Sequence, residues 1–390
     1  MIRSILDNDL YKFTMQQAVH VLYPRAMAKY VFINRAGTIF PDGFANRLSA
    51  EIKKMESLRL TDEELSYLKD RCYFLTPVYL DFLRHYRYDS GEVKVAVENG
   101  SLSIGVEGPW FRTILWEVPL MAMVSELYFE MTKPSIESKE QQIINNIAKT
   151  TSLRNANVKF ADFGTRRRFS ALTQENLLRD ILSVKGNTLT GTSNVYFAMK
   201  FNIKPIGTHA HEWFMFHAAQ NGYRLANKTA LDNWINVYKG NLGIALTDTY
   251  TTDTFLQAFN SVNARLFDGV RHDSGDPVSF TDKMVNHYRE LRIDPMTKTI
   301  VFSDGLNVSE AIRIRQYCEG KINSSFGIGT TLTNDIGPKA LNMVIKLSEC
   351  CSHVNSPWIP VVKLSDVEGK HTGTKDELDL CIRTTKRSSI

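Results

Sequence analysis

Cysteine is scarce in this sequence, and it is not arranged in pairs. The 390 residues contain five cysteines, an odd number, and two of them (Cys350 and Cys351) are adjacent. Their spacing includes neither Cys-x-x-Cys nor a regular disulfide pattern. We interpret all five as reduced thiols that mostly fill the core, which is typical of a cytoplasmic protein.

Long apolar runs, direct repeats and low-complexity linkers are also absent. No stretch approaches the roughly 20 apolar residues that a membrane-spanning helix needs. Near the start, Asp7 and Asp9 come before any apolar run long enough for a secretory signal. We therefore expect no membrane association and no secretory signal.

The sequence has little excess of charge of either sign. Its 47 lysines and arginines nearly balance 42 aspartates and glutamates, which leaves a formal charge of +5. Such an excess suits an enzyme with anionic, phosphorylated substrates, although it also arises by chance, and we predict no nucleic-acid partner. An apolar share of 43% is ordinary for a globular protein. The length fits one large α/β domain and a smaller one.

The first part of the chain shows no regular alternation of strands and helices. We predict a charged helix over residues 51–70 and an apolar helix over residues 114–131 that is interrupted at Pro119. Between them, Asn99-Gly100 separates two alternating apolar runs, which is a strong hairpin signal. We predict an N-terminal α+β domain over residues 1–125 that can also receive the C-terminal tail.

After about residue 150, short apolar runs that end in small and polar residues alternate with helix-like stretches. This pattern indicates parallel βα units, and eight or nine of them indicate a closed barrel. We predict a TIM-like α/β barrel, irregular in places, as the catalytic domain over residues 126–390. The runs are VKFADFG, LTGTSN, KPIGTHAH, GIALTDTY, DGVRHDSGD, TIVFSDG, SSFGIGT, NMVIKL and PVVKLSD.

His209 and His211 lie two residues apart at the end of one predicted strand, so they would share a face. They could form a metal-binding pair, although the later histidines do not supply the remaining ligands convincingly. They could also be structural, or one could be a nucleophilic or proton-carrying histidine that a carboxylate orients. Asp248, which ends the next predicted strand, is the natural carboxylate.

Three further segments carry polar groups at predicted strand ends. In ADFGTRRR, we expect one of the three arginines to bind an anion, and Phe163 offers a flat apolar surface. Asp273 in RHDSGD and Asp304 in FSDG could accept from ribose hydroxyls or hold Mg²⁺ through water. The late FGIGT segment has glycines that let backbone N–H groups approach a phosphate.

Taken together, these segments resemble the nicotinate phosphoribosyltransferase family of NAD salvage. The resemblance extends over nearly the whole chain, and so many ordered motifs are more specific than any single one. The matching segments are DNDLYKFTMQQAV, GPWFRTILWEVPL, ADFGTRRRFS, GTSN, GTHAHEWF, GVRHDSGDP, VFSDGLN, SFGIGT and VVKLSD.

The resemblance implies a reaction and its small-molecule partners. Nicotinate and 5-phosphoribosyl-1-pyrophosphate (PRPP) would give nicotinate mononucleotide and pyrophosphate, coupled to ATP hydrolysis. ATP would be a co-substrate, and Mg²⁺ would accompany PRPP and ATP rather than occupy a protein-only metal site. A homodimer is compatible with the resemblance, because the nicotinamide-using cousins take one aromatic site residue from a second subunit.

The resemblance also implies roles for individual residues. His211 would be the histidine that ATP phosphorylates, with Asp248 steadying its imidazole. Tyr11 and Phe163 would sandwich the pyridine ring. The remaining assignments are Arg166 and Arg271 to the base and pyrophosphate region, Asp273 and Asp304 to the ribose, and Gly327, Gly329 and Thr330 to the 5′-phosphate loop. His209 stands where other members carry glutamine and receives no role.

Ser193 bears on the choice between acid and amide. The nicotinamide-using cousins place an aspartate at this position, so a serine favours nicotinate. Alternatives within the same chemistry are nicotinamide or quinolinate phosphoribosyl transfer. Other classes are a metal-dependent barrel hydrolase with His209 and His211, a Schiff-base aldolase with Lys346 or Lys363, and, as the weakest alternative, a non-catalytic binding module.

Overall fold

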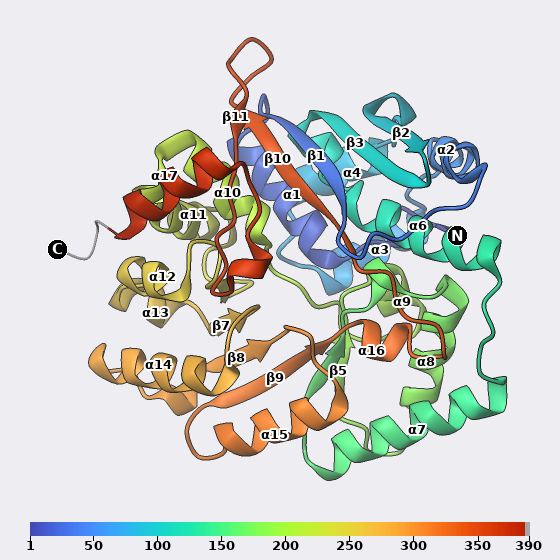
Figure 1. Cartoon of the computed structure of the whole chain (residues 1–390). Helices are drawn as coiled ribbons and strands as arrows, with labels where there is room; N and C mark the ends of the chain where they lie inside the picture. The colour runs from blue at the N-terminus through green and yellow to red at the C-terminus, as the bar shows by residue number, and fades with distance from the viewer. Residues whose placement is uncertain (387–390) are drawn as a thin grey trace.

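The structure, a computed structural model, describes residues 1–386 and contains two β-sheets with helices packed around them (Figure 1). The last four residues of the predicted barrel domain, 387–390, lie outside the described residues. One sheet is antiparallel, with the strand order β11-β10-β1-β3-β2, and the other is parallel, with the order β5-β4-β9-β8-β7-β6. Among residues 1–386, no helix is both long and apolar enough to cross a membrane.

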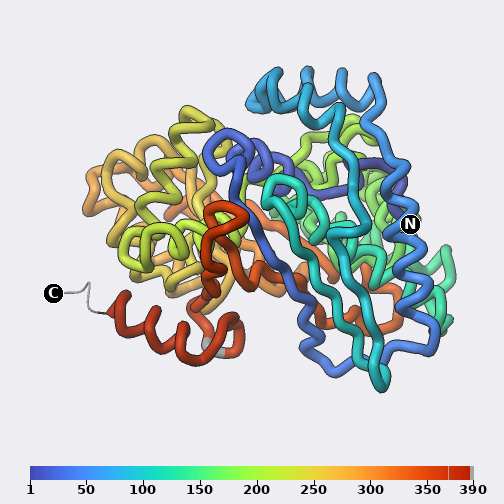
Figure 2. The backbone as a smooth tube through the Cα atoms, turned by 90° about the horizontal axis from the view of Figure 1, so that it is seen from above, coloured from blue at the N-terminus to red at the C-terminus, as the bar shows by residue number. Residues whose placement is uncertain are grey.

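The antiparallel sheet joins the two ends of the chain. Its strands are β1 (Met27–Asn34), β2 (Val93–Glu98), β3 (Ser101–Pro109), β10 (Met343–Cys351) and β11 (Ile359–Pro360). The hairpin prediction is confirmed, since Asn99 and Gly100 connect β2 and β3 with φ of 50° and 76°. The prediction that NMVIKL forms a barrel strand is wrong. This run belongs to β10, which pairs antiparallel with β1, and PVVKLSD forms no barrel strand either (Figures 1 and 2).

The helices of the first part depart from the prediction in two places. They are α1 (Leu10–Leu22), α2 (Phe44–Met55), α3 (Asp62–Arg71), α4 (Pro77–His85), α5 (Trp110–Thr113) and α6 (Glu117–Thr132), with the short η1 (Ser90–Glu92). The single helix predicted over residues 51–70 is two, because Thr61 and Glu64 form a capping box that starts α3. Pro119 does not interrupt a helix, because it lies in the first turn of α6, where its missing N–H is not needed.

The parallel sheet carries the alternation of strands and helices expected of a barrel. Its strands are β4 (Phe160–Asp162), β5 (Leu189–Thr192), β6 (Ile244–Leu246), β7 (Gly269–His272), β8 (Thr299–Phe302) and β9 (Asn323–Ile328). The helices from this part onward are α7 (Lys139–Asn155), α8 (Ala171–Ser183), α9 (Val195–Lys200), α10 (His211–Asn221), α11 (Tyr223–Tyr238), α12 (Thr252–Ala258), α13 (Ser261–Leu266), α14 (Pro277–Glu290), α15 (Val308–Cys318), α16 (Thr330–Thr333) and α17 (Lys375–Lys386). The short η2 (Thr165–Arg167), η3 (Pro295–Thr297) and η4 (Glu368–Lys370) complete the set.

The barrel is irregular, because residues 203–210 take the place of a strand between β5 and β6. On the β5 side, Thr192 N donates to Lys204 O (3.1 Å) and Ile206 N donates to Thr192 O (2.9 Å). On the β6 side, Thr208 Oγ1 donates to Ile244 O (2.9 Å). The KPIGTHAH run therefore fills the gap without forming a strand. The expected α/β barrel with an N-terminal α+β part is confirmed, with six strands in its sheet rather than eight or nine.

The start of the chain ties the two parts together. Asp9 and Asn194 form a β-bridge, and Leu10 N donates to Ser193 O (2.7 Å). Helix α1 then lies between the antiparallel sheet and the barrel (Figure 1). Its middle is buried on all sides, polar residues included, so α1 positions side chains toward the barrel mouth.

Candidate active site

A cavity of about 240 Å³ lies where the carboxyl ends of the parallel strands meet α1, α6 and β10. Residues that follow β4, β5, β7, β8 and β9 line it, as expected for the functional face of a barrel. Ten of the twelve predicted site residues line this cavity: Tyr11, Phe163, Arg166, Ser193, His211, Arg271, Asp273, Gly327, Gly329 and Thr330. Asp248 and Asp304 lie beside it, outside the lining.

The two predicted aromatic residues enter the cavity from different elements. Tyr11 comes from the first turn of α1, and Phe163 follows β4. The Phe163 ring packs directly against Gly327, since a Cβ at this position would lie 2.3 Å from Phe163 Cδ2. The absence of a side chain at Gly327 is therefore needed for packing of the ring, apart from any role in phosphate binding. One chain supplies both aromatic residues.

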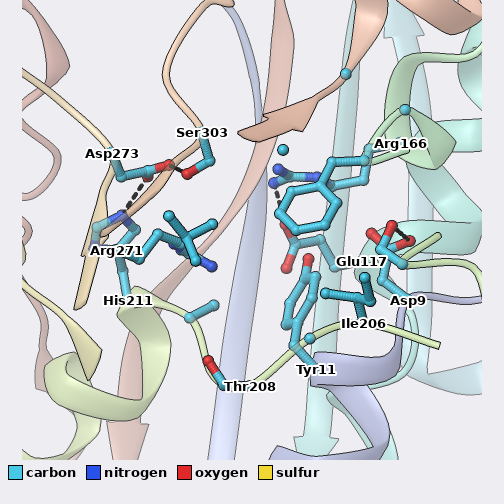
Figure 3. A pocket seen from close by; sticks show the side chains of 18 of the residues that line it. Asp9, Tyr11, Glu117, Arg166, Ile206, Thr208, His211, Arg271, Asp273 and Ser303 are labelled. Atoms are coloured by element: carbon cyan, nitrogen blue, oxygen red, sulfur yellow. Dashed lines mark hydrogen bonds and ion pairs between the residues drawn. The ribbon is translucent and has the colours of Figure 1, made fainter. Parts of the chain in front are cut away.

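His211 begins α10 and lies among acids on the other side of the cavity (Figure 3). Its Nε2 is 2.9 Å from Asp273 Oδ2 and 3.6 Å from Asp248 Oδ1. Its Nδ1 is 3.0 Å from Thr249 Oγ1. The carboxylate that is hydrogen-bonded to the ring is thus Asp273, whereas Asp248 accepts from Ser274 Oγ (2.7 Å). Lys363 Nζ lies 3.3 Å from Asp248 Oδ2.

The surroundings keep the His211 imidazole neutral. Burial and the nearby Lys363 charge lower the pKa of His211 to about 4, against the opposing effect of Asp248 and Asp273. Burial alone would raise the pKa of Asp273, but Arg271, His211 and Lys363 outweigh it and hold this pKa well below its ordinary value. At neutral pH the site therefore combines a neutral imidazole, which retains a lone pair, with ionised carboxylates.

A metal ion bound as in a barrel hydrolase does not fit the histidine pair. His209 is fully buried, with Phe214 and Trp234 against its ring, and its nitrogens have no hydrogen-bond partner among the described residues. The expected shared face is absent, because His209 lies in the irregular segment and His211 in a helix. One ligand atom each from His211, Asp248 and Asp273 lie within 4.8 Å of one another, and carboxylates suit Mg²⁺. Asp273 faces the cavity and could hold Mg²⁺ there.

The arginines of the RRR run separate into different environments. Arg166 Nη1 lies 3.5 Å from Glu117 Oε1 at the cavity wall, and Arg167 also lines the cavity. Arg168 is fully buried and pairs with both oxygens of Asp7 (2.8 and 2.9 Å), so it is structural. Arg271 donates to His209 O (3.3 Å), and its guanidinium borders the cavity.

Sequence reasoning gave no role to Glu117 and Glu212, which line the cavity, or to Lys12 and Tyr30, whose side chains contact these acids. Glu117 and Glu212 share the buried Lys12, whose Nζ lies 2.5 Å from Glu117 Oε2 and also contacts Glu212 Oε1. Tyr30 donates to the other Glu212 oxygen (2.6 Å). Lys346 of β10 lines the cavity too, and burial lowers its pKa to about 8. The signal was available for Lys12, Glu117 and Glu212, because charged residues among the apolar ones of DLYKF, WEVPL and HEWF need buried partners.

The two predicted residues outside the lining both have lysine partners. Lys363 contacts Asp248 as described above, and Lys370 of η4 forms an ion pair with Asp304. Lys370 Nζ also donates to the backbone oxygen of Asp273 (3.3 Å). The segment after β11 therefore brings two cations, Lys363 and Lys370, to the aspartates beside the cavity.

Comparisons with known proteins agree with this geometry. Residues 6–125 match the model of the nicotinate phosphoribosyltransferase N-terminal domain, and residues 158–385 match that of the nicotinate phosphoribosyltransferase family. The chain is 58% identical to a nicotinate phosphoribosyltransferase of Desulforapulum autotrophicum over 387 residues, which covers 99% of this chain and 100% of the relative. It is 46% identical to that of Chromohalobacter salexigens, with 98% of each chain covered.

Solved structures give the same result. The crystal structure of nicotinate phosphoribosyltransferase from Porphyromonas gingivalis superposes with a TM-score of 0.97 at 44% identity, over 99% of this chain and 100% of that one. The Vibrio cholerae enzyme superposes with a TM-score of 0.92 at 36% identity, over 99% and 94%. This chain therefore belongs to the nicotinate phosphoribosyltransferase family.

Proposed function

We propose that the chain transfers the phosphoribosyl group of PRPP to nicotinate, forming nicotinate mononucleotide and pyrophosphate, with ATP hydrolysis coupled to the transfer. The observation that carries this proposal is one cavity that gathers an aromatic pair, the arginines Arg166 and Arg271, a carboxylate and a glycine loop. Family membership along the whole chain supports the same reaction.

The transfer needs positioning and charge compensation more than covalent chemistry. The pyridine nitrogen attacks C1 of the ribose as the bond to pyrophosphate breaks, through a state with oxocarbenium character. Tyr11 and Phe163 hold the ring in line for this attack. Arg166 and Arg271 balance the charge that develops on pyrophosphate, and Asp273 orients the ribose hydroxyls.

The 5′-phosphate belongs in this proposal at the loop after β9. Gly329 and Thr330 stand there at the start of α16, where backbone N–H groups can approach an anion. Mg²⁺ bound with PRPP would offset the charge of its phosphates, and Asp273 is the residue of this chain that would hold it.

ATP acts through His211 in this proposal. The neutral imidazole attacks the γ-phosphate, ADP leaves, and water later hydrolyses the phosphohistidine. The phosphoryl group adds about −2 of charge beside Asp273 and Lys363. That charge would draw the neighbouring cations toward His211 and change the affinity of the cavity for its anionic substrates.

Radiolabelled nicotinate tests the proposal directly. The purified chain, given PRPP and Mg²⁺, should convert labelled nicotinate into its mononucleotide, faster with ATP than without it. Nicotinamide and quinolinate in parallel reactions should be poor substrates. Conversion of quinolinate or nicotinamide in preference to nicotinate would overturn the proposed substrate.

Location and assembly belong to the same proposal. A cytoplasmic location fits the five cysteines, all free and buried. A homodimer is not required to complete the aromatic pair, because Tyr11 and Phe163 come from one chain. Sedimentation of the purified chain with and without PRPP would determine its oligomeric state.

A further inference from the structure

Asp9 and Ser193 form a hydrogen-bonded pair in the wall of the cavity. Ser193 Oγ donates to Asp9 Oδ1 at 2.7 Å, and the two residues are 3% and 2% exposed. Figure 3 shows Asp9 on the side of the cavity that carries Tyr11, Ile206 and Arg166, across from His211 and Asp273. The pair therefore borders the place proposed for the pyridine ring.

The hydrogen-bonding capacity of this pair depends on one proton. A serine hydroxyl has a single O–H to donate. While Asp9 is ionised, that O–H is committed to Asp9, and the pair presents only acceptors to a ligand. Nicotinate brings a carboxylate, which also only accepts, whereas the amide nitrogen of nicotinamide donates. The ionised pair thus suits the amide and opposes the acid.

We propose that nicotinate binds the form in which Asp9 is protonated, so that each nicotinate takes up one proton from solvent at Asp9. The proton adds to the Asp9 carboxylate, and the new O–H donates to Ser193 Oγ or to the substrate. Ser193 is then free to donate its own O–H to the nicotinate carboxylate. This inference rests on the proposed function and names the residue that decides between acid and amide.

The groups around Asp9 make the protonated form accessible. Asp9 belongs to none of the ion pairs formed within residues 1–386; its polar side-chain partners are the Ser193 and Thr165 hydroxyls. Burial raises the pKa of Asp9, and Arg166 and the two hydroxyls oppose this shift, while Asp162 adds to it. Arg166 is shared with Glu117, and Arg168 is committed to Asp7. Tyr11, on the same segment, is uncharged at neutral pH, since an ordinary tyrosine pKa already lies well above 7 and burial raises it further.

Titration calorimetry measures the proton directly. Nicotinate is titrated into the wild-type chain, with magnesium pyrophosphate present so that no transfer occurs, in buffers of different ionisation enthalpy between pH 6 and pH 8.5. Above the pKa of Asp9 in the free chain, we expect uptake of about one proton per nicotinate and about tenfold weaker binding per pH unit. Nicotinamide should bind with no proton uptake.

Two variants assign the proton to its residue. Asp9→Asn keeps the shape of the side chain but cannot titrate, so proton uptake should disappear and the affinity for nicotinate should lose its pH dependence. Ser193→Ala keeps the carboxylate, so uptake should persist while nicotinate binds more weakly. Circular dichroism checks that both variants are folded. If one variant is not folded, the proton uptake measured with the wild-type chain decides whether nicotinate binding takes up a proton.

The outcomes separate this inference from the proposed function. Nicotinate binding by the wild type without proton uptake overturns the inference alone, as does uptake that persists unchanged in Asp9→Asn. A wild-type chain that binds no nicotinate at any pH overturns the proposed function and this inference with it.

Discussion

Arg271 is a cavity arginine whose charge no carboxylate within 4.0 Å neutralises among the described residues. Its guanidinium donates to the backbone oxygen of His209 (3.3 Å), and this contact leaves the charge available to a ligand. We predict that Arg271→Ala lowers kcat/KM about a hundred- to thousandfold, because a charge-assisted contact to a developing anion contributes roughly 3–4 kcal/mol. Arg271→Lys should recover part of this loss. Steady-state kinetics with a folded variant that loses less than tenfold would place Arg271 outside the reaction.

His211 and His209 form a matched pair for testing the role of ATP. His211→Ala should abolish incorporation of labelled phosphate from γ-labelled ATP and the stimulation of transfer by ATP, while basal transfer persists at high substrate concentration. His209→Gln should still be phosphorylated, because His209 is buried against aromatic rings away from the acids. Label that remains in the His211→Ala protein would show that the acceptor is another residue.

Ser193→Asp would place a second carboxylate beside Asp9 and close to the proposed position of the substrate carboxylate. At a separation of about 4 Å and an effective dielectric constant near 20, this repulsion is worth about 4 kcal/mol, in part offset by protonation of one acid of the new pair. The ratio of kcat/KM for nicotinamide to that for nicotinate should therefore rise in the variant. This ratio is measured side by side for wild type and variant. Equal ratios would show that Ser193 does not lie in the base pocket.

At the scale of elements, the irregular segment 203–210 sets the distance between α1 and the barrel. Gly207 has φ of +159°, and a Cβ there would lie 2.8 Å from Tyr11 N, a backbone atom that cannot move without α1. We predict that Gly207→Ala destabilises the chain by roughly 1–3 kcal/mol and also raises the KM for nicotinate, because Tyr11 shifts.

A control substitution separates the steric effect from the conformational one. Gly222 also has positive φ (+78°), but a Cβ there would meet nothing within 4 Å. Gly222→Ala should therefore cost stability without changing the KM for nicotinate. Urea unfolding and the nicotinate KM of both variants provide the comparison, and an unchanged KM in Gly207→Ala would contradict the role given to this contact.

Across the whole molecule, buried histidines predict acid sensitivity. Burial lowers the pKa of His209, His211, His217 and His272, to about 4 for His211 and His217. Between pH 6.5 and pH 4 the unfolded chain binds protons on these residues and the folded chain does not, so the free energy of unfolding falls as the pH falls through this range.

Unfolding by urea at a series of pH values checks this expectation. The stability of wild type should decrease steadily below pH 6.5, and His209→Gln, which removes one of the four titrations, should show a smaller decrease. A stability that stays constant from pH 6.5 to pH 4 would mean that these histidines do not remain neutral in the folded chain.

The sequence alone determined those features that depend on neighbours in the chain. Asn99-Gly100 predicted its hairpin because the turn requires positive φ at both residues. The polar residues after the apolar runs were expected to converge because the carboxyl ends of parallel strands share one edge. The resemblance to the family identified most of these residues. Residues 51–70 were predicted as one charged helix, whereas the capping box of Thr61 and Glu64 begins a second helix within this range.

Only the tertiary structure decided which distant groups become partners. The alternation in NMVIKL fits either kind of sheet, and the free edge of β1 decided that β10 pairs there and brings Lys346 to the cavity. Likewise Asp273 rather than Asp248 is hydrogen-bonded to His211, and Asp9 accepts from Ser193. Local pattern cannot rank such pairs, because the difference between 2.9 Å to Asp273 and 3.6 Å to Asp248 is set by the packing of whole elements, here of α1 and α10 against the barrel.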